Sequence, residues 1–257
     1  MNFVDTHAHL MGKEFVEDLD AVLSRAKKAQ VKQIMIITLS AKEAQQALTF
    51  LDAHPHEGFS VATGIFMDEA ATYTENDWNR LEQIARDPRI SCIGEIGLDY
   101  YWEKEPTIHK SQQDLFIRQI ELAKRLHKPI LVHSREAMQD TYNIMKAHHT
   151  HGLLHCFSGS KEMAIEFTKL GYYIALGGAL TFKNSRHSQE VAKEIDARYL
   201  LSETDCPYMA PEPVRGTRNE PANIPYIVSK MAMLRGITLK DMAAQIQANW
   251  IRFLEQK

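Results

Sequence analysis

Two histidines near the start of the chain have the spacing of a metal site. His7 and His9 lie two residues apart, shortly after the apolar pair Phe3-Val4. Residues two apart on a β-strand point to the same side, so both imidazoles can reach one ion. The triplet is weak evidence alone, because most His-x-His triplets lie on the protein surface by chance and bind no metal. Four more residues of ligand type end or follow apolar segments further along the chain: Glu95, His133, His155 and Asp205. These six residues predict a metal centre.

Apolar segments alternate with amphipathic segments along the whole chain. Most apolar segments are continuous, such as Ile34-Met35-Ile36-Ile37, which is typical of strands buried on both faces of a parallel sheet. The amphipathic segments carry apolar residues at helical spacing, as at Phe116, Ile120 and Ala123. Eight strands are predicted, at residues 3–7, 33–38, 59–64, 90–95, 129–133, 152–156, 172–177 and 199–203.

Eight strands, each followed by a helix, predict a (β/α)₈ barrel with a single domain over residues 1–257. The functional residues of such barrels lie at the carboxyl ends of the strands. The six residues of ligand type are predicted at five strand ends, and therefore on one face of the barrel. The long proline-rich stretch at residues 206–222 is also expected to be functional, because long loops in compact domains usually are.

The composition excludes several other classes of protein. With 44% hydrophobic residues the chain can bury a large core. The net charge of −3, from 30 basic and 33 acidic residues, argues against a general nucleic-acid-coating surface or a membrane-binding face, but leaves room for a local basic site. Three widely separated cysteines suggest a reducing compartment, and neither a signal peptide nor a membrane span is expected. We expect a cytoplasmic protein, with a monomer favoured.

The motifs around these residues resemble those of the TatD-like metal-dependent deoxyribonuclease family, within the amidohydrolase superfamily. They cover nearly the whole chain in the order of the family, and six separate motifs would have to coincide by chance. The matching segments are residues 5–10, 93–100, 129–135, 155–159, 202–208 and 218–221.

The resemblance implies two divalent metal ions. His7, His9 and Asp205 would hold one ion, His133 and His155 would hold the other, and Glu95 would bridge them. One departure stands out after the third predicted strand. The family usually has Gly-x-His-Pro there, whereas this chain has Gly64-Ile65-Phe66-Met67. The ligand set is therefore complete, but the substrate contact made by that histidine is in doubt.

Two bridged metal ions suit phosphodiester hydrolysis. Ions ~3.5–4 Å apart can hold both the attacking and the leaving oxygen. Two divalent ions contribute +4, and Glu95 with Asp205 contributes −2, so the site keeps about +2, which attracts a phosphate and lowers the pKa of bound water toward ~7. We therefore assign catalytic roles to Glu95, as the bridge, and to Asp205, as a ligand that also acts as general base.

The donor types leave the identity of the metal open. Four histidines with two carboxylates favour Zn, Mn, Co or Ni, whereas the family resemblance implies activity with Mg. We expect a site that accepts several of these ions. Glu203, two residues before Asp205, is predicted to orient a ligand, with an ordinary charge pair as the alternative.

Four further residues are candidates for substrate binding. Arg135 and Arg218 are predicted to contact phosphate, the alternative being solvated surface charges. Tyr101 and Trp102 follow the fourth strand and are predicted to stack unpaired bases, the alternative being that they pack the loop against the barrel. Asp99, in the same segment, is interpreted as structural.

The function that follows is that of a metal-dependent hydrolase of phosphodiester bonds, most simply a deoxyribonuclease. Single-stranded DNA ends fit better than duplex DNA, because the mouth of a barrel is a pocket and the chain is not strongly basic. One alternative is a hydrolase that acts on a small amide, lactone or phosphotriester, or on an aminoacyl-tRNA ester. A second is a non-enzymatic partner protein that has inherited the barrel.

Overall fold

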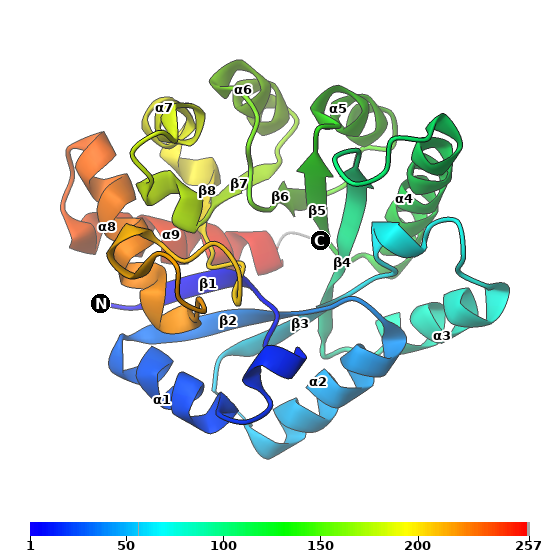
Figure 1. Cartoon of the computed structure of the whole chain (residues 1–257), viewed down its shortest axis with the longest axis horizontal. Coiled ribbons are helices and arrows are strands. Elements are labelled where there is room, and N and C mark those ends of the chain that lie inside the picture. The colour runs from blue at the N-terminus through cyan, green and yellow to red at the C-terminus, as the bar shows by residue number, and fades with distance from the viewer. Residues whose placement is uncertain (56, 256–257) are drawn as a thin grey trace.

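The computed structural model describes residues 1–55 and 57–255, so position 56 and the last two residues of the predicted domain lie outside it. Eight strands of the described chain form one parallel sheet in the order β1 to β8, and helices surround it (Figure 1). The strands are β1 (Phe3–Ala8), β2 (Val31–Thr38), β3 (Phe59–Thr63), β4 (Ile90–Asp99), β5 (Ile130–Arg135), β6 (Gly152–Leu154), β7 (Tyr173–Leu176) and β8 (Leu200–Ser202).

A helix follows each strand, as predicted, and the last strand is followed by two. The helices are α1 (Leu19–Lys28), α2 (Ala41–Ala53), α3 (Glu75–Ala85), α4 (Pro106–Leu126), α5 (Met138–Ala147), α6 (Lys161–Lys169), α7 (Arg186–Glu194), α8 (Ile224–Arg235) and α9 (Leu239–Glu255). Short 3₁₀ turns lie in several loops, among them η1 (Lys13–Phe15), which follows β1. The helix starts follow local capping chemistry: the Ser40 hydroxyl, for example, accepts a hydrogen bond of 3.3 Å from the backbone N–H of Glu43 at the start of α2.

The two ends of the sheet meet between β1 and β8. There the Ser202 hydroxyl donates to the carbonyl of Val4 at 2.7 Å, and the Thr6 hydroxyl donates to the carbonyl of Ser202 at 3.1 Å. Ala8 and Cys206 form a parallel bridge just beyond, and α9 packs against both strands. The sheet is thus a nearly closed barrel, and the predicted single-domain (β/α)₈ fold is confirmed.

Two strands, β4 and β5, continue past their ligand-type residues, which the sequence did not predict. β4 continues four residues past Glu95 to Asp99, and β5 continues two residues past His133 to Arg135. The prediction that Glu95 and His133 end their strands is wrong, because the β4–β5 ladder continues to the pair Asp99 and Arg135. Glu95 consequently lies on the floor of the barrel mouth, with 3% of its surface exposed.

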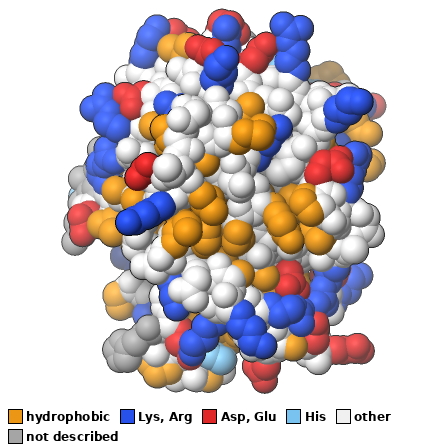
Figure 2. Space-filling view, turned by 90° about the vertical axis from the view of Figure 1, so that its left-hand side faces the viewer, with side chains coloured by type: hydrophobic (Ala, Val, Ile, Leu, Met, Phe, Trp, Pro, Cys, Tyr) orange, Lys and Arg blue, Asp and Glu red, His pale blue; other side chains and the backbone are white. Residues whose placement is uncertain are grey.

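The surface mixes charge and apolar side chains. Figure 2 shows the face that lies to the left in Figure 1, with apolar patches in its middle and both basic and acidic side chains around them. This mixed pattern matches the small net charge of the chain. Within the described residues, no helix combines the length and apolarity required to cross a membrane.

Candidate metal centre

Glu95 lies at the centre of a cluster of imidazoles at the barrel mouth. Its Oε2 is 3.3 Å from His7 Nε2 and 3.7 Å from His9 Nε2. Its Oε1 is 2.9 Å from His155 Nε2 and 3.0 Å from His133 Nδ1. Each oxygen of this central carboxylate therefore faces a different pair of histidines. The cluster contains all six residues of ligand type: His7, His9, Glu95, His133, His155 and Asp205.

The spacing within each pair fits a shared metal ion. His7 Nε2 and His9 Nε2 are 3.1 Å apart, and Asp205 Oδ1 is 3.7 and 3.5 Å from them. His133 Nδ1 and His155 Nε2 are 2.9 Å apart. Ligand atoms bonded to one ion at ~2.1 Å and about 90° apart lie roughly 3 Å from each other. Both pairs, each with the central carboxylate, are groups that could hold an ion.

The negative charge of the two carboxylates in the cluster also favours the binding of cations. Burial raises the pKa of Glu95, but the imidazoles of His155, His133 and His7 outweigh it and hold that pKa well below its usual range. Desolvation likewise raises the pKa of Asp205, and nearby imidazoles bring it below the usual value. Both carboxylates are therefore ionised at neutral pH. Their charge, together with four closely packed imidazoles, forms a donor set that fits divalent cations.

A buried aspartate that the sequence analysis left without a role positions two of the ligands. Asp5 Oδ1 accepts hydrogen bonds from the backbone N–H of His7 at 3.3 Å and of Thr204 at 2.9 Å, and Oδ2 accepts from the Thr204 hydroxyl at 2.6 Å. Burial raises the pKa of Asp5 to about 7. Asp5 thus ties the end of β1 to the segment that carries Asp205. The signal in the sequence was a carboxylate two residues before a ligand.

The backbone around Asp205 aims its side chain into the mouth. Asp205 has a left-handed φ of 56°, which aspartate tolerates better than most residues. Its N–H donates to the carbonyl of His7 at 2.9 Å, which fixes the turn against β1. Buried Asn219 donates to the carbonyls of Thr204 and Tyr208, each at 2.8 Å, and so clamps both sides of the turn.

Two acidic residues contact the far side of the histidine ligands. Glu203 is fully buried, accepts a hydrogen bond from the backbone N–H of Cys156, and has Oε1 3.7 Å from His155 Nδ1. Asp99 Oδ2 is 3.3 Å from His133 Nε2, the nitrogen that faces away from Glu95. Such carboxylates fix the ring orientation of metal-binding histidines. Glu203 lies where the predicted orienting role requires. Asp99, interpreted as structural, does accept a hydrogen bond from the backbone N–H of Tyr101 at 2.8 Å, and it also lies close to His133 because β4 extends this far.

The predicted substrate-binding residues fall into two groups. The Arg135 guanidinium lies 3.8 Å above the Tyr101 ring and 5.5 Å from the Trp102 ring, and Arg135 and Trp102 line the mouth. Tyr101 and Trp102 are 40% and 67% exposed, so neither ring is buried against the barrel. Arg218 lies elsewhere: its guanidinium pairs with both oxygens of Asp18, at 2.8 and 2.7 Å. Its predicted phosphate contact is not supported, because this pair holds the proline-rich loop against α1.

The mouth is a cavity of about 940 Å³. Besides the ligand-type residues it has cationic side chains from Lys13, Lys42 and Arg135. Phe66 lies where the family histidine would stand, with its ring centroid 6.5 Å from that of His133. The apolar part of the wall is formed by Met11, Ile37, Leu39, Phe66 and Met209.

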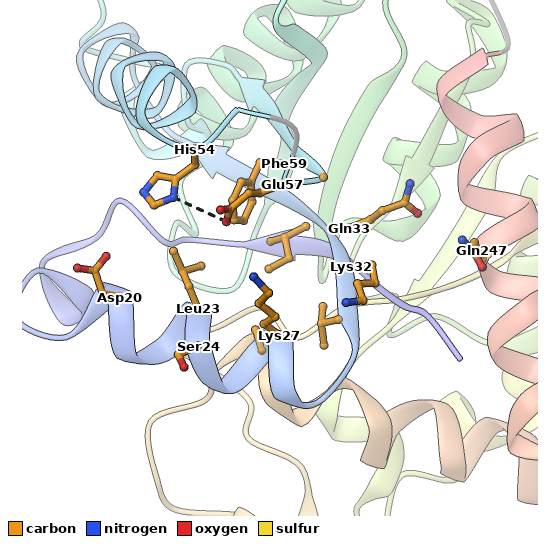
Figure 3. Close-up of a pocket in the computed structure, with 14 residues that line it drawn as sticks. Asp20, Leu23, Ser24, Lys27, Lys32, Gln33, His54, Glu57, Phe59 and Gln247 are labelled. Atoms are coloured by element: carbon orange, nitrogen blue, oxygen red, sulfur yellow. Dashed lines mark ion pairs between the residues drawn. The ribbon is translucent and has the colours of Figure 1, made fainter.

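A second cavity, of about 680 Å³, lies between α1, the beginnings of β2 and β3, and α9. Figure 3 shows Lys27, Lys32 and Gln33 around it, with His54 and Glu57 joined by an ion pair of 3.7 Å. Of the described residues that line it, none belongs to the predicted site. It lies toward the amino ends of the strands, away from the ligand cluster.

Comparison with known proteins places this geometry in a family. The family model described as "TatD related DNase" matches residues 4–255. The uncharacterized metal-dependent hydrolase YabD of Bacillus subtilis is 37% identical, over 93% of this chain and 94% of that protein. The uncharacterized metal-dependent hydrolase YcfH of Escherichia coli K12 is 32% identical, over 98% and 95%. The crystal structure of YJJV, a TatD homologue from the same organism, superposes with a TM-score of 0.88 at 28% identity, covering 98% of this chain and 97% of that one. The chain therefore belongs to the TatD family of metal-dependent hydrolases.

Proposed function

We propose that this protein hydrolyses phosphodiester bonds in DNA with two divalent metal ions. The observation that carries the proposal is the placement of Glu95, whose two oxygens face separate histidine pairs at 2.9–3.3 Å for the nearest nitrogens. A single carboxylate flanked in this way fits a bridge between two ions. His7, His9 and Asp205 would hold one ion, and His133 and His155 the other.

The residues around the ions have distinct tasks. When bound, two divalent ions would supply Lewis acidity and a water of lowered pKa. Asp205 is ionised at neutral pH and lies at the edge of the cluster, so it takes the proton of the attacking water. Arg135 lines the mouth and offers a guanidinium to a phosphate. Asp99 and Glu203 keep His133 and His155 in their orientations.

The donor set also bears on the metals. Imidazole nitrogens favour Zn, Mn, Co or Ni, and carboxylates accept Mg as well. We infer a centre that is active with more than one of these ions. The substrate we infer is single-stranded DNA near an end, because the reacting groups lie on the floor of a pocket and the small net charge of the chain gives no broad basic surface for a duplex.

The apolar wall beside Phe66 favours one alternative. A phenyl ring there cannot donate a hydrogen bond to a phosphate, and neighbouring Met11, Ile37 and Leu39 extend the apolar surface. Such a wall suits a hydrolase of a small amide, lactone or phosphotriester, or of an aminoacyl-tRNA ester. A non-enzymatic role fits less well, because all six ligand-type side chains lie together.

The test uses the purified chain with Mn²⁺, Mg²⁺ and Zn²⁺ in separate reactions. The substrates are end-labelled single-stranded DNA, duplex DNA, RNA, an aminoacyl-tRNA and bis(p-nitrophenyl) phosphate. We expect single-stranded DNA to be cut fastest, with loss of activity in Glu95→Ala and unchanged activity in Lys27→Ala, which alters only the second cavity. Turnover of the aminoacyl-tRNA without DNA cleavage would reject the nuclease in favour of the alternative.

A further inference from the structure

Two exposed aromatic side chains line the barrel mouth from different loops. Trp102 follows β4 and is 67% exposed, and Tyr208 follows β8 and is 58% exposed. The sheet order runs from β1 to β8 and closes between β8 and β1, so the loops after β4 and β8 lie half a barrel apart (Figure 1). The loops that carry the two rings therefore lie on opposite sides of the barrel mouth.

Each ring is associated with a different half of the ligand cluster. Tyr208 is three residues after Asp205, and its ring centroid is 6.2 Å from that of His9. Trp102 lies beside Arg135, which ends the strand that carries His133. A substrate strand that lies across both groups of ligands can therefore reach both aromatic rings.

The backbone under Tyr208 is held in place, which suits a stacking platform. The N–H of Tyr208 donates to the carbonyl of Asp205 at 2.9 Å, and its own carbonyl accepts from Asn219 Nδ2 at 2.8 Å. Asn219 is fully buried, so the platform is anchored in the interior. A backbone that is fixed before binding loses no freedom when a base stacks on the side chain, so less of the binding free energy is lost to ordering the loop.

Cationic side chains line the mouth on both sides of the barrel, and Glu14 lies near Tyr208 as well. Arg135 lines the mouth beside Trp102, and Lys13, on the η1 turn after β1, lines it on the β8–β1 side, where Tyr208 lies. Proteins that bind single strands combine aromatic platforms for the bases with positive charge for the backbone. The mouth has Trp102 with Arg135 on one side, and Tyr208 with Lys13 and Glu14 on the other.

We propose that Tyr208 is a second base-stacking platform, and that the substrate strand crosses the metal centre with one unpaired base on Trp102 and another on Tyr208. The scissile phosphate then lies between the two stacked nucleotides. This inference rests on the proposed nuclease function and narrows its substrate: the enzyme requires an unpaired base on each side of the bond that it cuts.

The experiment uses one single-stranded oligonucleotide with a mapped cleavage site, and two versions with an abasic residue on the 5′ or the 3′ side of the scissile phosphate. With the wild-type chain and Mn²⁺, each abasic residue should lower kcat/KM by roughly 5- to 150-fold, the equivalent of ~1–3 kcal/mol per stacked base. Tyr208→Ala should lose sensitivity to one abasic position and keep sensitivity to the other. Trp102→Ala should show the converse pattern.

Two further variants separate stacking from support of the loop. Tyr208→Phe keeps the ring and should keep the wild-type pattern, whereas Tyr208→Leu keeps bulk without aromaticity and should behave as Tyr208→Ala. Tyr226→Ala removes an exposed tyrosine on α8 and is the matched control. If Tyr208→Ala remains as sensitive as the wild type to both abasic positions, Tyr208 is not a platform.

Binding measured by fluorescence anisotropy makes the test independent of turnover. If no oligonucleotide is hydrolysed with any ion, the proposed function fails. The affinities of the Mn²⁺-loaded chain for the intact oligonucleotide, and for versions with one abasic residue at each position in turn, then decide the stacking proposal. Two sensitive positions, one lost in Tyr208→Ala and the other in Trp102→Ala, support it, and equal affinity for all these oligonucleotides overturns it.

Discussion

The two cavities of this barrel differ less in size than in the arrangement of their side chains. The mouth measures about 940 Å³ and the second cavity about 680 Å³, and both are lined by charged and histidine side chains. In the mouth, the ligand atoms of four histidines and two carboxylates each lie 2.9–3.7 Å from at least one other ligand atom of the cluster. In the second cavity, the ion pair drawn in Figure 3, between His54 and Glu57, spans 3.7 Å on one short segment.

The contrast teaches that convergence of ligand atoms distinguishes the site, and cavity size does not. All eight strands point their carboxyl ends toward the same rim, so residues from β1, β4, β5 and the loops after β1, β6 and β8 meet there. The second cavity is lined instead by the starts of two strands and by the sides of helices, where charged residues remain solvated. Substitutions in the two cavities should accordingly have different consequences.

The largest effect is expected from Glu95→Ala. Because this carboxylate faces both histidine pairs, its removal should reduce occupancy at two metal positions, whereas His133→Ala should empty mainly one. Elemental analysis per chain, after loading with Mn²⁺ or Zn²⁺, measures this. Lys27→Ala in the second cavity is the control and should retain the wild-type metal content. Equal loss of one ion in both mouth variants would show that Glu95 does not bridge.

Asp205→Asn should lower turnover by ~10²–10⁴, the usual cost of losing a general base. The variant keeps the size of the side chain and one ligand oxygen, so metal should be retained. Initial rates on end-labelled single-stranded DNA, at matched metal occupancy, measure the effect. Near-normal rates at full occupancy would place the base elsewhere in the mouth.

Asp99→Asn should weaken the affinity of the His133 side of the centre by ~10–100-fold, as removal of an orienting carboxylate typically does. Asparagine keeps the oxygen that accepts from the backbone N–H of Tyr101, so the loop should persist. Competition with a chelator of known affinity measures the change. Asp20→Asn, in the second cavity, should leave it unaltered. An unchanged affinity in Asp99→Asn would return Asp99 to a structural role.

Phe66→His should have the smallest effect, and it should raise phosphodiester turnover, whereas the other substitutions lower activity or metal binding. A hydrogen bond to a charged group contributes ~1.5–3 kcal/mol, and the lower value corresponds to roughly a tenfold gain in phosphodiester turnover if the bond strengthens in the transition state. The rate on bis(p-nitrophenyl) phosphate, at unchanged metal content, measures it. Absence of a gain would indicate a pocket reshaped for a different substrate and would favour the alternative hydrolase.

Much of the fold and of the ligand cluster could be predicted from the sequence. The eight strands and the barrel were predictable because continuous apolar segments alternated with amphipathic ones at regular intervals. The ligand-type residues were predictable because each ended or followed such a segment. Strand ends were less predictable: Ile96-Gly97-Leu98 continues β4 as apolar residues, so only the observed pairing with β5 shows how deep Glu95 lies.

By itself, the sequence determined the fold class, the six residues of ligand type and the family, because residue type and periodicity along the chain are local properties. Only the tertiary structure decided which nitrogens face which oxygen of Glu95, that Asp99 contacts His133, and that Arg218 pairs with Asp18 instead of lining the mouth. It also placed the loop of Tyr208 opposite that of Trp102. These are relations between residues up to about two hundred positions apart, and they depend on where the barrel closes and how far each strand runs.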